Sequence, residues 1–180
     1  MLVEVVSWLS LVTRTAVRAS ATVVATGADG SVRERSEHVL EAEDLLRWSY
    51  VAFGDGDEVH QSCDGVELVQ AAHGRSTRTR VAGGPEFFSS WPGVVDAWLV
   101  EMLRPVDLLA RVAVSSITGD RLVRMTATPL GNEPSPYNGF SIPDGRTLAM
   151  SLDMERGCFT GAAVTRPGCD ALTFTVTHVE

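Results

Sequence analysis

The chain has 180 residues, of which 44% are hydrophobic and 21% charged, and its formal net charge is −8. These proportions are those of a globular protein and exclude a chain that is mainly disordered. The sequence contains no lysine, so its 15 strongly basic residues are all arginines. An acidic chain repels phosphate backbones, which argues against a nucleic-acid partner. At this length we expect a single domain over residues 1–180.

The longest apolar stretch covers residues 2–12 and is too short for a helix that crosses a bilayer. No basic residue precedes it, so it does not match a secretory signal. Cys63, Cys158 and Cys169 are too few, and odd in number, for a disulfide framework. Together these features predict a cytoplasmic protein without an integral membrane segment.

Alternation of apolar and polar residues predicts a protein built mainly of β-strands. In residues 16–26, for example, Val17, Ala19, Ala21 and Val23 alternate with more polar positions. Glycine-containing turns separate such stretches, among them an Asp-Gly pair that favours a tight hairpin. In chain order the expected strands cover residues 16–26, 32–40, 45–53, 58–63, 66–71, 111–117, 121–128, 147–153, 158–164 and 171–179.

Helices are expected in few places. Apolar residues three and four apart predict a helix over residues 94–104, and Pro105 ends it. A short helical turn is expected at 106–109, and residues 3–13 favour a helix over a strand. The order lacks a β-α-β rhythm, so we expect an α+β fold. It would be a large curved antiparallel sheet, a half-barrel or barrel-like cup, with a few helices packed into its concave side.

One connection, residues 129–146, is unusually long and contains half of the chain's 8 prolines. Connections of this length are either functional lids or partly flexible loops. Tyr137, Phe140 and Ile142 give the segment apolar anchors, which favours an ordered lid.

The order of several short motifs resembles a known family. These motifs are Arg47-Trp48, Asp64-Gly65, residues 105–109 (Pro-Val-Asp-Leu-Leu), residues 119–121 (Gly-Asp-Arg) and residues 152–157 (Leu-Asp-Met-Glu-Arg-Gly). In this order the sequence resembles the LolA/LppX-like lipoprotein-carrier superfamily, and its actinobacterial members most closely. The resemblance implies a half-barrel of about eleven strands with helices in its mouth, and a hollow that holds acyl chains.

Large apolar side chains on the expected helix, strands and lid are candidates for contact with an apolar ligand. The predicted ligand-binding residues are Trp48, Trp98, Met102, Phe140 and Met150. Tryptophan combines a large apolar area with one polar group, which suits a ligand with few oxygens. The alternative interpretation is that these residues form the core, which is the usual place of buried aromatic side chains.

Other polar residues do not form a recognisable catalytic or metal motif. His60 and Cys63 lie three apart in an expected strand, which puts them on opposite faces. His38, like the remaining histidines, is predicted at the surface. No Gly-rich phosphate loop, nucleophile elbow or zinc motif is present, so we expect neither a cofactor nor a metal. The arginines of residues 75–80 suggest either an anion contact or a solvated strand edge.

Two hypotheses for function remain. The first is a cytoplasmic protein that binds a hydrophobic small molecule or lipid in its cup. The second is a cofactor-independent cyclase or isomerase of a polyketide-like pathway, which acts on that ligand by orienting it. For the second, Tyr50 and Tyr137 are the predicted catalytic residues, with Tyr50 as the hydrogen-bond donor to a carbonyl. The oligomeric state does not follow from the sequence.

Overall fold

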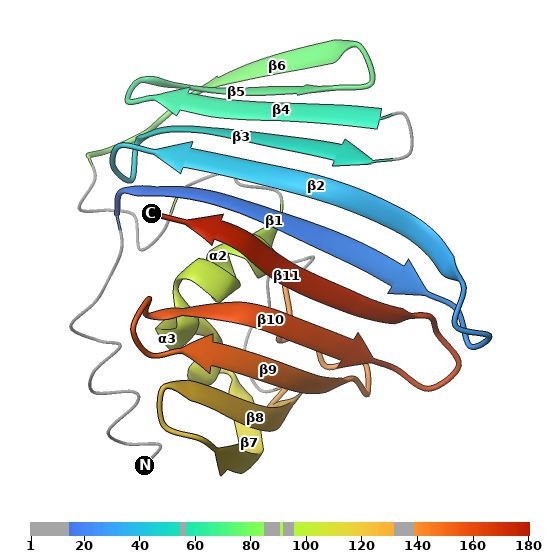
Figure 1. Cartoon of the computed structure of the whole chain (residues 1–180). Coiled ribbons are helices and arrows are strands. Elements are labelled where there is room, and N and C mark those ends of the chain that lie inside the picture. The colour runs from blue at the N-terminus through green and yellow to red at the C-terminus, as the bar shows by residue number, and fades with distance from the viewer. Residues whose placement is uncertain (1–14, 55–56, 85–90, 92–95, 132–138) are drawn as a thin grey trace.

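The computed structural model describes residues 15–54, 57–84, 91, 96–131 and 139–180 (Figure 1). Within them, eleven strands form one antiparallel sheet in the order β6-β5-β4-β3-β2-β1-β11-β10-β9-β8-β7, and two short helices accompany it. The strands are β1 (Val17–Thr26), β2 (Val32–Ala42), β3 (Arg47–Gly54), β4 (Asp57–Asp64), β5 (Glu67–Ala72), β6 (Arg75–Arg80), β7 (Val112–Thr118), β8 (Leu122–Pro129), β9 (Thr147–Asp153), β10 (Cys158–Thr165) and β11 (Ala171–Val179). The helices are α2 (Ala97–Leu103) and α3 (Pro105–Leu109).

The sheet is open, with β6 and β7 at its two edges. Strands that follow each other in the sequence lie side by side, except β6 and β7, which lie at opposite edges. In addition, β1 pairs with β11, which joins the first and last described strands. The residues at the hairpin turns favour tight turns between neighbouring strands. At the β4–β5 turn, Gly65 has a φ of 95°, and the Asp64 carboxylate accepts the backbone N–H groups of Val66 and Glu67.

The two helices connect the two edge strands across one face of the sheet, and the sheet curls around them (Figure 1). Helix α2 packs against β10, and α3 packs against β7. The ring of Trp98 on α2 lies 4.9 Å from the ring of Phe174 on β11. Most strand residues that face the helices are apolar, as the period-two pattern predicts, and they form the core.

The expected strand ranges all overlap observed strands, and β6 is an additional one. It consists of the arginine-containing segment, and all six of its residues are exposed at the sheet edge, so the interpretation as a solvated strand edge is confirmed. Helix α2 occupies part of the range expected for a helix, while residues 3–13 lie outside the described residues. One prediction is wrong: His38 is buried, with 5% of its surface exposed.

Candidate functional site

A hydrogen-bonded chain of four polar side chains lies between β2, β3 and the start of α2. Ser36 Oγ lies 2.7 Å from Nε2 of His38, and Nδ1 of His38 lies 2.8 Å from the hydroxyl oxygen of Tyr50. The Tyr50 hydroxyl donates to Oδ2 of Asp96, which also lies 3.4 Å from His38 Nδ1. Because the Tyr50 proton goes to Asp96, its oxygen accepts from His38, which places a proton on Nδ1 of that ring.

Burial sets the electrostatics of this chain. Tyr50 has no exposed surface, and burial together with the neighbouring Asp96 carboxylate raises the pKa of its hydroxyl well above the usual value. Burial also acts to raise the pKa of Asp96, but hydrogen bonds from His38 and Tyr50 outweigh it and leave that pKa below the usual value. At neutral pH the chain therefore holds an ionised Asp96 and a protonated Tyr50 hydroxyl.

A buried carboxylate, that of Glu101, fixes the described end of the long loop. Glu101 on α2 is 2% exposed, and it accepts hydrogen bonds from the Phe140 backbone N–H at 2.6 Å and from Ser141 Oγ at 3.4 Å. Arg111 lies 3.5 Å away. Burial raises the pKa of Glu101, and these contacts only partly offset it. Residues 139–146 are thus packed onto α2, while Tyr137 lies outside the described residues.

Most of the predicted ligand-binding residues lie in the packed core. Trp98, Met102 and Phe140 are between 0% and 4% exposed, and the Phe140 ring meets the Phe174 ring edge-on at 4.9 Å. Met150 is 2% exposed and lies beside a small cleft of about 320 Å³ on β7, β8 and β9. Trp98, Met102 and Phe140 line neither this cleft nor the larger one described next.

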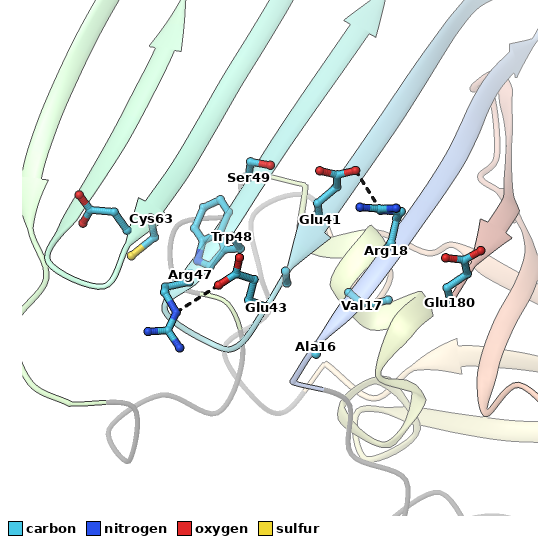
Figure 2. Close-up of a pocket in the computed structure, with 12 residues that line it drawn as sticks. Ala16, Val17, Arg18, Glu41, Glu43, Arg47, Trp48, Ser49, Cys63 and Glu180 are labelled. Atoms are coloured by element: carbon cyan, nitrogen blue, oxygen red, sulfur yellow. Dashed lines mark ion pairs between the residues drawn. The ribbon is translucent and has the colours of Figure 1, made fainter.

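The larger cleft, about 670 Å³, lies where β1, β2, β3, β4 and β11 end; we call it the rim cleft (Figure 2). Its apolar floor is one cross-strand row of the inner face. Val17 pairs with Ala42, Ala42 with Trp48, and Trp48 with Cys63. Three interstrand steps of about 4.8 Å make this row roughly 14 Å long. Trp48 is thus the predicted ligand-binding residue that lines the rim cleft.

Charged side chains also line the rim cleft, and they come from both faces of the sheet. They are Arg18, Glu41, Glu43, Arg47, Asp64 and Glu180, and their formal charge is −2. Figure 2 shows two ion pairs among them, Arg18 with Glu41 at 3.1 Å and Arg47 with Glu43 at 3.4 Å. Because these side chains are more than half exposed, such pairs contribute little to stability.

One residue that lines the rim cleft has an unpaired buried polar atom. Trp48 is 4% exposed, and among the described residues none accepts a hydrogen bond from its indole N–H. A buried donor without a partner costs about 1–3 kcal/mol. Beside it, burial raises the pKa of the Cys63 thiol, so this sulfur lines the cleft as an apolar group.

Sequence reasoning missed His38 and Asp96. His38 lies two residues from a serine in the alternating pattern of a strand, and this pattern does not indicate that the neighbouring strand supplies Tyr50 as a partner. Asp96 directly precedes a helix, and its role there is to accept from Tyr50. His60 is exposed and Cys63 buried, as expected for opposite faces. The described residues contain no cluster of three or more His, Cys, Asp or Glu side chains suited to a metal ion.

No family model matches this chain, and no curated protein does. Solved structures overlap with it loosely. A structure of MucB overlaps 99% of this chain at 13% identity, with a TM-score of 0.46, and the chain spans 57% of MucB. A DUF1329 family protein from Desulfovibrio piger overlaps 98% at 11% identity, with a TM-score of 0.43 and 90% of its own length covered.

A LolA superfamily protein from Nitrosomonas europaea overlaps 98% of the chain and 91% of its own length, at 4% identity and a TM-score of 0.38. Overlaps this loose do not transfer individual residues or a ligand from one protein to another. What the described residues define is a class of structure: an open, curved antiparallel sheet around two short helices, with a cleft at its rim. No helix in the described part of the chain is long and apolar enough to span a membrane.

Proposed function

We propose that this protein binds a hydrophobic small molecule or lipid, and that the rim cleft is its binding site. The observation that carries the proposal is the floor of that cleft, a continuous apolar row with one unpaired buried donor at Trp48. Small-molecule sites are mostly apolar clefts of about 300–1,000 Å³ with a few placed polar groups. The volume of about 670 Å³ and the single indole N–H fit that description.

The rim cleft is a better candidate than the space between α2 and the sheet. Trp98, Met102 and Phe140 are already in contact with protein side chains there, so a ligand at that place would have to displace them. Close-packed interiors resist such displacement because each lost contact has to be replaced. The rim cleft needs no rearrangement of α2.

Native mass spectrometry of the purified full chain, before and after addition of medium-chain apolar ligands, tests the proposal. The critical variant is Ala42→Phe, which fills the middle of the cleft floor. The matched control is Ala113→Phe, at an exposed position of β7. We expect the wild type and the control to bind and Ala42→Phe to lose most binding. Equal binding by Ala42→Phe, or none by the wild type, would sink the proposal.

A cofactor-independent cyclase or isomerase is the second candidate function. The chain of Ser36, His38, Tyr50 and Asp96 favours it, because all four side chains can donate or accept a proton. The Tyr50 hydroxyl already donates to Asp96, so a substrate carbonyl would have to replace that carboxylate. Tyr50→Phe then abolishes turnover of a bound ligand; unchanged turnover would exclude Tyr50 as the donor.

A cytoplasmic location and an actinobacterial type of the fold also belong to this proposal. The sparse cysteines support the first, since Cys63, Cys158 and Cys169 are free thiols. The exclusive use of arginine supports the second. Fractionation of cells that express the tagged full chain tests the location, and recovery in the cytoplasmic fraction is the expected result.

A further inference from the structure

The arginines of the rim cleft already face carboxylates. Arg18 pairs with Glu41 at 3.1 Å, and Arg47 lies 3.4 Å from Glu43 and is also paired with Asp44. An anionic ligand that approached either guanidinium would compete with a carboxylate that belongs to the protein. The two arginines therefore do not form a ready site for a carboxylate or phosphate.

The remaining charges of the cleft add to this effect. Backbone N–H groups of Glu67 and Val66 hold the pKa of Asp64 below its usual value, so this carboxylate is ionised at neutral pH. Glu180 is the other acid, and His178 lies 3.3 Å from it. The cleft has four carboxylates and two guanidinium groups, so its net negative charge repels an anionic ligand.

The floor of the cleft provides a hydrogen-bond donor. The buried N–H of Trp48 lacks an acceptor among the described residues, and it lies in the middle of the apolar row. A hydrogen-bond acceptor on the ligand would satisfy this donor, and an acceptor without charge would not be repelled by the carboxylates at the rim.

We propose that the rim cleft selects uncharged apolar molecules that carry a carbonyl, ester or hydroxyl oxygen, and that it discriminates against fatty-acid anions. The oxygen accepts the indole N–H of Trp48, and the apolar body lies along the row from Val17 to Cys63. This inference rests on the proposed function of the same cleft. It goes further because it assigns the class of ligand and the residue that recognises its polar group.

Binding of 2-decanone and of decanoate to the full chain, measured by titration calorimetry at pH 7.5 and low salt, tests the selectivity. We expect 2-decanone to bind at least about tenfold tighter than decanoate, because like charges in an interface disfavour association strongly. Trp48→Phe keeps an aromatic ring but lacks the N–H, and we expect it to weaken 2-decanone binding by about fivefold, the usual net value of one hydrogen bond. Decanoate binding as tight as that of 2-decanone, or unchanged 2-decanone affinity in Trp48→Phe, overturns the inference.

A charge variant provides a second measurement that does not depend on the indole. Glu43→Gln removes a carboxylate whose side chain is 82% exposed, so the fold tolerates it. We expect Glu43→Gln to reduce the ratio of 2-decanone affinity to decanoate affinity. Glu34→Gln, which is exposed on β2 but outside the cleft lining, should leave that ratio unchanged. An unchanged preference in Glu43→Gln contradicts the electrostatic part. Absence of binding for both ligands contradicts the proposed function itself, which is a different result from a reversed preference.

Discussion

His38 and Tyr50 are joined by a 2.8 Å hydrogen bond although they are not opposite each other in the sheet. In the β2–β3 ladder His38 pairs with Ala52, and Tyr50 pairs with Leu40, so the contact is diagonal. Asp96 at the start of α2 accepts from the same hydroxyl. This pair therefore ties the helix to the sheet through buried polar groups rather than through apolar contact alone.

Tyr50→Phe removes the hydroxyl that links β3 to α2. It leaves His38 Nδ1 and the Asp96 carboxylate without that partner, and we expect a loss of about 1–3 kcal/mol in the free energy of unfolding. Urea denaturation followed by circular dichroism measures it. Ser49→Ala, on the outer face of the same strand, is the control and should change little. A double-mutant cycle with Asp96→Asn should give a coupling energy above about 0.5 kcal/mol; additive effects would mean that the contact does not contribute.

Glu101→Gln changes the pH dependence of stability. The folded-state pKa of Glu101 is raised above its usual 4.5 by burial, so the folded chain binds this proton more strongly than the unfolded chain. Its contribution is greatest below pH 4.5 and is lost as the pH rises through the folded-state pKa. We expect the free energy of unfolding of Glu101→Gln, relative to the wild type, to increase as the pH rises from 4 to 7. Glu34→Gln is the control; a difference that stays constant with pH contradicts the prediction.

The contribution of Asp144 to stability depends on pH in the opposite direction to that of Glu101. Hydrogen bonds from Arg146, with a further one from Arg166, lower the pKa of Asp144 from 3.8 to about 2. Its stabilising contribution is present above pH 3.8 and is lost as the pH falls towards 2. Asp144→Asn should therefore be less stable than the wild type at pH 5 and approach it at pH 2, in urea titrations at each pH. Asp120→Asn, at an exposed turn, should show no such convergence, and a gap that persists at pH 2 would refute the assignment.

The strands were predictable because alternation of apolar and polar residues reports directly which face is buried. Alternation did not predict strand β6, because Arg75–Arg80 has no apolar residue and owes its conformation to backbone pairing with β5; only the arginines suggested a solvated strand edge there. The helix was found from its apolar spacing. The tight turn at Asp64-Gly65 was also predicted correctly from the sequence.

The candidate sites were only partly predictable. Tyr50 and Trp48 stood out as large aromatic side chains on one strand, but their partners depend on which strands become neighbours. The contact of His38 with Tyr50 requires the register of β2 and β3, and the floor of the rim cleft requires the register of four strands. Local patterns carry little information about register across a sheet, so these arrangements emerge only in the folded structure.

Gly139→Ala tests how firmly Glu101 holds the loop. A Cβ at position 139 would lie 2.8 Å and 2.9 Å from the two carboxylate oxygens of Glu101, closer than van der Waals contact allows. The carboxylate cannot swing away without leaving the Phe140 N–H, to which it is hydrogen-bonded at 2.6 Å. We expect Gly139→Ala to lower the free energy of unfolding by about 1–3 kcal/mol, the usual cost of overpacking. At Gly161 the nearest atom is 3.9 Å from the added Cβ, so Gly161→Ala is the control and should cost much less in the same urea titration. Equal stabilities of the two variants would show that the loop moves freely away from Glu101.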